Sequence, residues 1–152
     1  MQSGIWFWTE GWHKEDDEKA KLVLFRAAFE GKPDNTHIRI TADTRYKLYV
    51  NGIHVQSGPS KGDDKVRYID EADIGEWLTD GENVIAVNVL RYSFDHPYHS
   101  NHSLCSAQTP GLYVEGIDLK WKSHVVRTVR FEGEEGGFAP LHVHERIATD
   151  PA

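Results

Sequence analysis

The sequence predicts an all-β protein, and three observations lead to that prediction. Short segments rich in β-branched and aromatic residues recur along the chain, with turn-forming clusters between them. Helical periodicity is nearly absent. One alternating segment, Arg45 to Val50, runs directly into Asn51-Gly52, the dipeptide that best closes a two-residue hairpin because both residues tolerate positive φ. Short strands at this spacing indicate a sandwich or a barrel.

Three clusters of Gly, Pro, Asn or Asp, where the chain can reverse, separate expected strands: Gly31–Asn35, Gly58–Asp64 and Thr79–Asn83. In chain order the expected strands are Leu22–Glu30, His37–Ala42, Tyr46–Val50, a return strand through Ile53, His54 and Val55, Val84–Leu90, Leu112–Leu119 and Val125–Phe131. Only Glu71–Leu78 has the pattern of a helical turn, with Trp77 and Leu78 facing inward. A turn of that length is too short to form a layer of its own.

Alternation within the strands predicts which residues face the core. Tyr46, Leu48 and Val50 share one face of their strand, so we expect them to be buried while Lys47 and Tyr49 point outward. In Val84–Leu90 only Asn88 is polar. Such a strand fits the centre of a sheet or a position covered on both sides.

Composition limits the classes of protein to which the chain can belong. The 152 residues include 39% hydrophobic residues, enough for a core without disulfides or metal, and Cys105 has no partner for an intrachain bridge. A formal charge of -7 argues against nucleic acid as a partner. No apolar run reaches the roughly 18 residues of a membrane span. We expect one module at residues 1–132, followed by a tail or linker at 133–152 that leads toward a further domain.

One block of the sequence carries a family resemblance. Arg39 to Gly52 (RITADTRYKLYVNG), then Gly58-Pro59, Tyr68-Ile-Asp70 and Gly81-Glu-Asn-Val-Ile85 resemble the N-terminal β-sandwich module of bacterial α-L-rhamnosidases of the inverting glycoside hydrolase type. The likeness covers about Leu24 to Val89. Related patterns occur in the galactose-binding-like jelly-roll modules of β-galactosidase and β-glucuronidase relatives. The resemblance therefore implies a jelly-roll β-sandwich of two antiparallel sheets.

The resemblance also implies that this stretch is not the catalytic part. In such rhamnosidases the acid and base carboxylates belong to a separate (α/α)₆ barrel later in the chain, and nothing here resembles that barrel. The residues agree, because the acidic side chains lie in predicted turns or charged runs such as Glu15 to Glu18. An inverting glycosidase instead needs two carboxyl groups facing each other across a cleft. We therefore assign no catalytic residue and no cofactor.

Aromatic residues supply the candidate carbohydrate site. Sugar rings stack their C–H faces on Trp and Tyr, while Asn, Asp, Arg and His hold the hydroxyl groups. Trp6 and Trp8 are spaced to share one face of an extended segment, and a second group of aromatic residues flanks a polar loop further along. The candidate residues are Trp6, Trp8, Trp12, Tyr92, Phe94, His96, Tyr98, His99 and Asn101. The alternative is that these aromatics pack between the sheets or against a neighbouring domain.

Three other constellations have simpler explanations. His96, His99 and His102, with Asp95, recur at metal-ligand intervals, but Pro97 makes their loop irregular, and we assign no metal site there or at His142-Val-His144. Ser57, His54 and Asp63 could form a triad, but no nucleophile elbow supports it. We expect Asp43 and Thr44 to cap a bend, and Arg45 to pair with a carboxylate such as Asp70.

These observations together predict a non-catalytic β-sandwich module of an α-L-rhamnosidase-like enzyme. The resemblance implies that the module packs beside the catalytic domain of the same parent chain and contacts a rhamnose-containing saccharide, and that the parent hydrolyses terminal α-L-rhamnosides. Two alternatives remain open at this point. The chain could be a stand-alone carbohydrate-binding module without an attached enzyme, or a brace between domains with no ligand.

Overall fold

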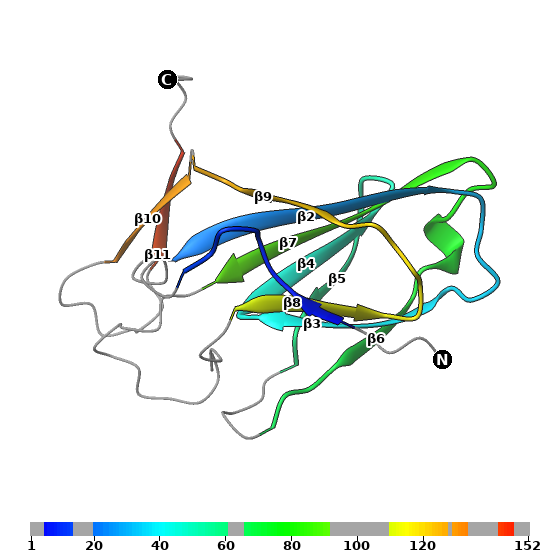
Figure 1. Cartoon of the computed structure of the whole chain (residues 1–152), viewed down its shortest axis with the longest axis horizontal. Helices are drawn as coiled ribbons and strands as arrows, with labels where there is room; N and C mark the ends of the chain where they lie inside the picture. The colour runs from blue at the N-terminus through cyan, green and yellow to red at the C-terminus, as the bar shows by residue number, and fades with distance from the viewer. Residues whose placement is uncertain are drawn as a thin grey trace.

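Two antiparallel sheets stack on each other in the computed structural model, which describes residues 5–13, 20–60, 66–91, 110–127, 129–133 and 143–147 (Figure 1). One sheet has five strands in the order β5-β4-β7-β2-β9, and the other has four in the order β1-β8-β3-β6. A separate two-stranded sheet joins β10 to β11. The predicted all-β sandwich of two antiparallel sheets is therefore confirmed.

The strands are short and follow the turn clusters of the sequence. They are β1 (Ile5–Phe7), β2 (Lys21–Glu30), β3 (His37–Asp43), β4 (Arg45–Val50), β5 (Ile53–Gly58), β6 (Asp70–Asp73), β7 (Glu82–Arg91), β8 (Gly111–Glu115), β9 (Lys122–Val125), β10 (Val129–Gly133) and β11 (Val143–Ile147). A 3₁₀ helix, η2 (Gly75–Trp77), lies between β6 and β7. Among the described residues, no helix is long and apolar enough to cross a membrane.

The hairpin predicted at Asn51-Gly52 is confirmed. Asn51 has φ 50° and Gly52 has φ 83°, and Val50 pairs with Ile53 across the turn. The Asn51 side chain also fastens the turn to its surroundings, because its amide donates to the Trp77 carbonyl at 2.8 Å and its oxygen accepts from the Val84 N–H at 2.8 Å. A β-bulge follows, where the pairing of β4 with β5 shifts between Leu48 and Tyr49.

The core lies between the two large sheets, as the alternation predicts. Tyr46, Leu48 and Val50 are each no more than 2% exposed, whereas Lys47 is exposed. β7 lies at the centre of its sheet, between β4 and β2. Its inward residues Ile85, Val87 and Val89 meet core residues from the facing sheet, including Ile38, Ile40 and Leu112. The expected position of this strand in a sheet centre is confirmed.

Three element predictions need correction. The strand expected over Leu112–Leu119 ends at Glu115, because Gly116 follows with φ 110°, a conformation that leaves the strand geometry. The strand expected over Val125–Phe131 is two strands, one paired with β2 and the other with β11. The helical turn expected over Glu71–Leu78 is only three residues long, because β6 pairs with β3 over its first part.

The β10–β11 pair joins residues from both sides of the predicted module boundary at residue 132. Val129 pairs with Ile147 and Gly133 with Val143. The expected tail therefore contains a strand, although its sequence carries no sustained alternation. The division of the chain into a module and a linker remains a prediction.

Candidate functional site

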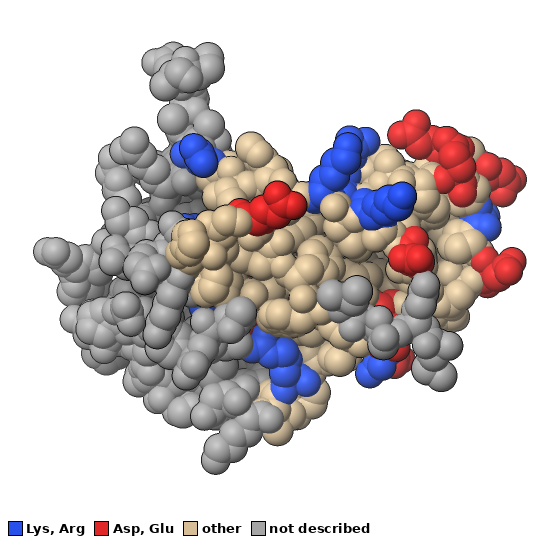
Figure 2. Space-filling model, viewed as in Figure 1, with Lys and Arg blue, Asp and Glu red and all other residues tan. Residues whose placement is uncertain are grey.

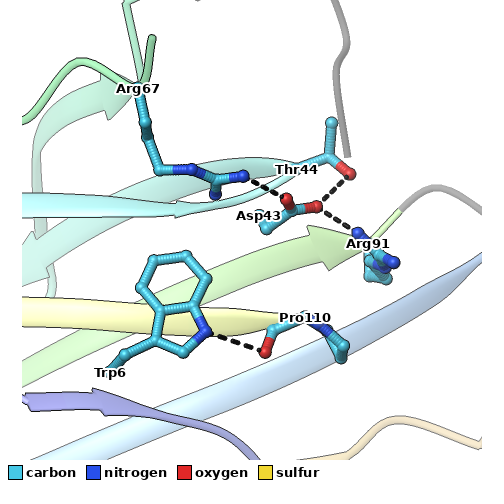
Figure 3. A network of polar contacts seen from close by, with 6 residues as sticks. All are labelled: Trp6, Asp43, Thr44, Arg67, Arg91 and Pro110. Atoms are coloured by element: carbon cyan, nitrogen blue, oxygen red, sulfur yellow. Dashed lines mark hydrogen bonds and ion pairs between the residues drawn. The ribbon is translucent and has the colours of Figure 1, made fainter. Parts of the chain in front are cut away.

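A cluster of charged side chains occupies one end of the sandwich, where β3 and β7 both finish. Asp43 is the last residue of β3 and Arg91 is the last residue of β7. Thr44 connects the two sheets, because its N–H donates to the carbonyl of Leu90 at 3.1 Å. The segment before β6 contributes Arg67. These groups come from three parts of the sequence, and the sandwich fold brings them together (Figure 3).

The Asp43 carboxylate lies between two guanidinium groups. Arg67 donates to one of its oxygens at 2.8 Å, and Arg91 and the Thr44 hydroxyl both donate to the other. The side chains of Asp43 and Arg91 are completely buried, whereas that of Arg67 is 32% exposed. Buried charges persist only when they are paired and hydrogen-bonded. The cluster thus has the character of a structural ion network that reaches the surface through Arg67.

Trp6 lies directly beneath this network. Its indole N–H donates to the Pro110 carbonyl at 3.2 Å, and the guanidinium carbon of Arg67 lies 5.0 Å from the centre of the ring (Figure 3). The ring also rests against Gly111, where an added Cβ would lie 2.1 Å from Trp6 Cε2. The Arg67 group therefore occupies the position over the indole that a stacked sugar ring would take.

Trp8 and Trp12 lie in other surroundings. The strand β1 ends at Phe7, so the alternation that would place Trp6 and Trp8 on one face stops there. Trp8 packs on the core residue Phe25 with ring centres 5.6 Å apart, and Phe7 contacts the same ring at 5.5 Å. Trp12 is half-buried, and its Nε1 is buried without a hydrogen-bond partner. The structure therefore does not gather the three tryptophans into one platform.

The second group of predicted site residues lies outside the described residues. It consists of Tyr92, Phe94, His96, Tyr98, His99 and Asn101, and the same applies to His102, Cys105, Asp63 and His142. Their role in carbohydrate contact remains a prediction. Within the described part of the chain, no group of three or more His, Cys, Asp or Glu side chains is placed to hold a metal ion.

His54 and Ser57 do contact each other, as the hypothetical triad requires. His54 Nε2 and Ser57 Oγ are 2.9 Å apart on β5, and the His54 ring also lies 5.3 Å from that of Tyr49. Both residues are exposed on an edge strand. A serine open to solvent, without an oxyanion hole, is not an activated nucleophile. We therefore assign this pair no catalytic role.

Asp70 is not the carboxylate that pairs with Arg45. Arg45 donates to the Pro59 carbonyl at 3.3 Å, while Asp70 accepts from the Tyr46 hydroxyl at 2.7 Å and from the Ser60 hydroxyl at 2.7 Å. Gln56 in turn donates to the Tyr46 oxygen at 2.8 Å. Burial of the phenol, followed by its hydrogen bond to Asp70, raises the pKa of Tyr46 far above its ordinary value.

Asp73, at the end of β6, is a carboxyl group with a shifted pKa. Hydrogen bonds from the Thr36 hydroxyl and the Gly75 N–H hold the pKa of Asp73 below its ordinary value. A general acid for glycoside hydrolysis needs the opposite shift, so that it carries a proton at neutral pH. Asp73 is therefore unsuited to that role.

Sequence reasoning missed the Arg67–Asp43–Arg91 network, although one signal was present. Arg91 has the same parity along β7 as the buried residues Val87 and Val89, so its side chain points inward. An inward arginine at the end of an apolar strand requires a buried anion. Because Asp43 lies 48 residues earlier in the chain, only the fold shows that it is that anion.

The fold and the site together define a two-sheet antiparallel β-sandwich whose polar cluster is structural. Two solved structures share this fold. A family GH78 rhamnosidase of Bacillus sp. GL1 matches with a TM-score of 0.57 and 28% identity, over 74% of this chain and 12% of that chain. An α-L-rhamnosidase from Dictyoglumus thermophilum matches with a TM-score of 0.52 and 21% identity, over 72% of this chain and 14% of that chain. No family model and no curated protein matches the sequence.

The two comparisons agree on what this chain corresponds to. It resembles a small β-rich module of GH78 α-L-rhamnosidases, as the sequence motifs indicate. The matched part is about one eighth of each of those enzymes, as the 12% and 14% coverage shows.

Proposed function

We propose that this chain is a non-catalytic β-sandwich module of an α-L-rhamnosidase-like glycoside hydrolase, and that it packs beside the catalytic domain of its parent chain. The observation that carries the proposal is the likeness to the Bacillus sp. GL1 rhamnosidase, which covers most of this chain but only 12% of that enzyme. In this proposal the parent removes terminal α-L-rhamnosyl groups. The module contributes structure and a contact with carbohydrate.

The polar chemistry of the described residues supports a non-catalytic role. The most deeply buried carboxylate, Asp43, is held between two arginines. The pKa of Asp73 is lowered rather than raised, because its carboxylate accepts hydrogen bonds from Thr36 and Gly75. Glycoside hydrolysis by inversion needs one protonated and one ionised carboxyl group on either side of the bond that is cleaved. Asp73 does not meet the requirement for the protonated member, and Asp43 is enclosed by its arginine partners rather than open to a substrate.

Two measurements test the proposal. The first is the length of the reading frame that contains these 152 residues, which we expect to extend into a catalytic domain. The second is hydrolysis of a chromogenic α-L-rhamnoside, which the intact protein should catalyse and the isolated chain should not. A frame that ends near Ala152 would favour a stand-alone carbohydrate-binding module. Hydrolysis by the isolated chain would contradict the non-catalytic assignment.

The proposed carbohydrate contact needs its own measurement. Calorimetric titration of the intact, catalytically inactivated protein with L-rhamnose should show binding that weakens when Trp12 is replaced by alanine. The matched control is Trp77→Ala, because Trp77 packs against the core beside the Asn51 turn. Equal affinity in all three proteins would place the sugar contact elsewhere and remove Trp12 from the site.

A further inference from the structure

The dipeptide that closes the β4–β5 hairpin is also the pair of residues in which asparagine is chemically least stable. In Asn-Gly the backbone nitrogen of the glycine can attack the side-chain carboxamide of the asparagine, because glycine has no side chain to obstruct the approach. Gly52 is exposed and Asn51 is half-buried, so water reaches this turn. Protection of Asn51 in the folded protein must therefore come from its hydrogen bonds rather than from burial.

The Asn51 carboxamide is bound at both its nitrogen and its oxygen. The nitrogen donates to the Trp77 carbonyl at 2.8 Å and to Asn83 Oδ1 at 2.9 Å, and the oxygen accepts from the Val84 N–H at 2.8 Å. The backbone N–H of Asn51 in turn donates to the Val84 carbonyl at 2.8 Å. Attack by Gly52 requires the carboxamide to turn toward the glycine nitrogen, which breaks the three side-chain bonds.

We propose that Asn51 is a deamidation site that the fold keeps closed, so that it reacts in unfolded molecules and is protected in folded ones. The Gly52 nitrogen forms a bond to Asn51 Cγ, the Cγ–Nδ2 bond breaks, and the proton of the Gly52 N–H leaves with the Nδ2 group as ammonia. Water then opens the resulting succinimide at either carbonyl carbon, which yields aspartate or isoaspartate at position 51. The inference does not depend on the proposed function.

The product does not suit the place that the carboxamide occupies. A carboxylate has no hydrogen to donate, so the Trp77 carbonyl and Asn83 Oδ1 would face a negative oxygen instead of a donor. Asn83 cannot turn to compensate without loss, because its own amide nitrogen donates to three backbone carbonyls. Isoaspartate also lengthens the backbone of a two-residue turn. A chain modified at position 51 therefore refolds to a less stable hairpin.

The charge of the product adds to this effect. Val50 lies opposite Ile85 on β7, which places the turn at the same end of the sandwich as the β6–β7 connection. Acidic side chains gather over that end (Figure 2), and they include the exposed Glu30 and Glu82. A further carboxylate there is repelled by its neighbours, and salt screens the repulsion. Deamidation should therefore destabilise the fold more at low ionic strength.

Ageing the protein in two states, followed by peptide mass spectrometry, tests the proposal. The intact protein is kept at mildly alkaline pH, which favours loss of the Gly52 proton, either folded in buffer or unfolded in guanidinium chloride. Trypsin then releases the peptide Leu48–Lys61, in which Asn51 is the sole asparagine. Because three hydrogen bonds must open first, each worth about a fivefold shift, we expect the peptide to deamidate about a hundredfold more slowly in the folded protein.

Two controls accompany this measurement. The peptide Tyr68–Arg91 should stay unmodified in both states, because its asparagines, Asn83 and Asn88, each precede a valine whose branched side chain hinders ring closure. Mass is measured rather than isoaspartate, since Asp80-Gly81 in that peptide can isomerise without a change of mass. The variant Gly52→Ala, whose added Cβ meets open space in the folded turn, should react more slowly than the unmodified protein in guanidinium chloride.

Each outcome bears on a separate part of the inference. Equal rates in the two states would show that the fold gives no protection, and an unmodified Leu48–Lys61 peptide in guanidinium chloride would show that Asn51 is not a deamidation site. Either result overturns the inference. The variant Asn51→Asp reproduces one product and should unfold at a lower urea concentration than the unmodified protein, most clearly at low ionic strength. An unchanged midpoint would overturn the predicted damage to the turn.

Discussion

At the residue scale, the Asp43 carboxylate is the group on which the end of the sandwich depends. It is completely buried and joins two arginines that come from separate parts of the chain. Removing one member of a buried ion network leaves the others without compensation in a medium of low dielectric. The network therefore stabilises this end only while its positive and negative charges compensate one another, and a single substitution that removes one charge should destabilise it.

The variant Asp43→Asn tests that balance. The amide keeps the size of the side chain but removes the negative charge that faces Arg91 and Arg67. We expect a loss of about 3–5 kcal/mol in the free energy of unfolding, measured by urea denaturation. The control Asp73→Asn changes an exposed carboxylate and should unfold near the urea concentration of the unmodified protein. Similar midpoints for the two variants would show that the buried network contributes little.

Thr41 carries a buried hydroxyl group that lacks a hydrogen-bond partner, in contrast to the paired Asp43 carboxylate. It is 2% exposed, and its hydroxyl has no hydrogen-bond partner. Replacing an unsatisfied buried hydroxyl by a methyl group of similar shape removes a desolvation cost. We therefore expect Thr41→Val to gain about 1 kcal/mol of stability, measured in the same urea series. Thr41→Ser, which keeps the hydroxyl, should show no gain, and a destabilised Thr41→Val would contradict this account.

At the scale of elements, the sandwich is held by side chains that link strands of different sheets. Tyr46 on β4 points inward and donates to Asp70 at the start of β6, in the opposite sheet. At the far end, the Asn83 side chain on β7 donates to the carbonyls of Gly31, Thr79 and Gly81, and so joins the β2–β3 and β6–β7 connections rather than the two sheets. Each link satisfies polar groups that would otherwise be buried unpaired where the strands end.

The Tyr46 link predicts a pH dependence. Burial and the hydrogen bond to Asp70 raise the pKa of Tyr46 in the folded protein above its ordinary value of 10.0, so the unfolded chain loses the proton first as the pH rises. The contribution to stability is complete below pH 10.0 and declines above it, up to the folded-state pKa. Tyr46→Phe should be less stable at pH 7 by about 1 kcal/mol, because it loses the bond to Asp70.

Unfolding at a series of pH values from 7 upward checks this prediction. Above pH 10.0 the free energy of unfolding should fall more steeply for the unmodified protein than for Tyr46→Phe. Parallel curves of unfolding free energy against pH for the two proteins would mean that Tyr46 does not cause the loss of stability at high pH. Lysine titration changes both proteins alike and cancels in the comparison.

Two substitutions in the hairpin turn compare the stability that its side-chain hydrogen bonds contribute with the stability that its backbone conformation contributes. Asn51→Ala loses the bonds to the Trp77 carbonyl, the Asn83 side chain and the Val84 N–H, and should cost about 3 kcal/mol. Gly52→Ala meets open space at φ 83° and should cost only about 1 kcal/mol from backbone strain. Thermal melts of the two variants check the order, and a larger loss for Gly52→Ala would reverse the argument.

At the scale of the whole molecule, the topology joins distant parts of the chain. The strand β1 pairs only with β8, and Ile5 lies opposite Val114 across more than a hundred residues of sequence. Charge is also unevenly distributed, because acidic groups gather over the end of the sandwich with the β2–β3 and β6–β7 connections.

The long-range pairing predicts slow folding. Loop-closure entropy opposes contacts between distant residues before the core can form, and β-sandwiches of this kind refold in roughly milliseconds to seconds. Stopped-flow dilution from urea, followed by tryptophan fluorescence, should show a main phase in that range. A main phase in microseconds would mean that local structure, rather than β1–β8 and β3–β8 pairing, limits the rate.

The local chemistry of the sequence was sufficient to predict much of the fold. The hairpin at Asn51-Gly52, the inward face of β4 and the central position of β7 all follow from turn residues and alternation. Short elements were harder to predict, because β6 has four residues and β1 has three, too few for a period to stand out. Of the candidate sugar-site residues, Trp6 has Arg67 over its ring and Trp8 packs on Phe25, and the role of the set in carbohydrate contact remains a prediction.

The sequence by itself determined the all-β class and the reversal at Asn51-Gly52, because turn preference and side-chain parity act between near neighbours. Its motifs also carry the resemblance to rhamnosidase modules. Only the tertiary structure decided that Asp43 neutralises Arg91, that Asp70 binds Tyr46 rather than Arg45, and that Arg26 and Lys47 lie on one sheet face. These outcomes depend on which strands become neighbours. Strand order is set by burial of the whole core, and no local pattern records it.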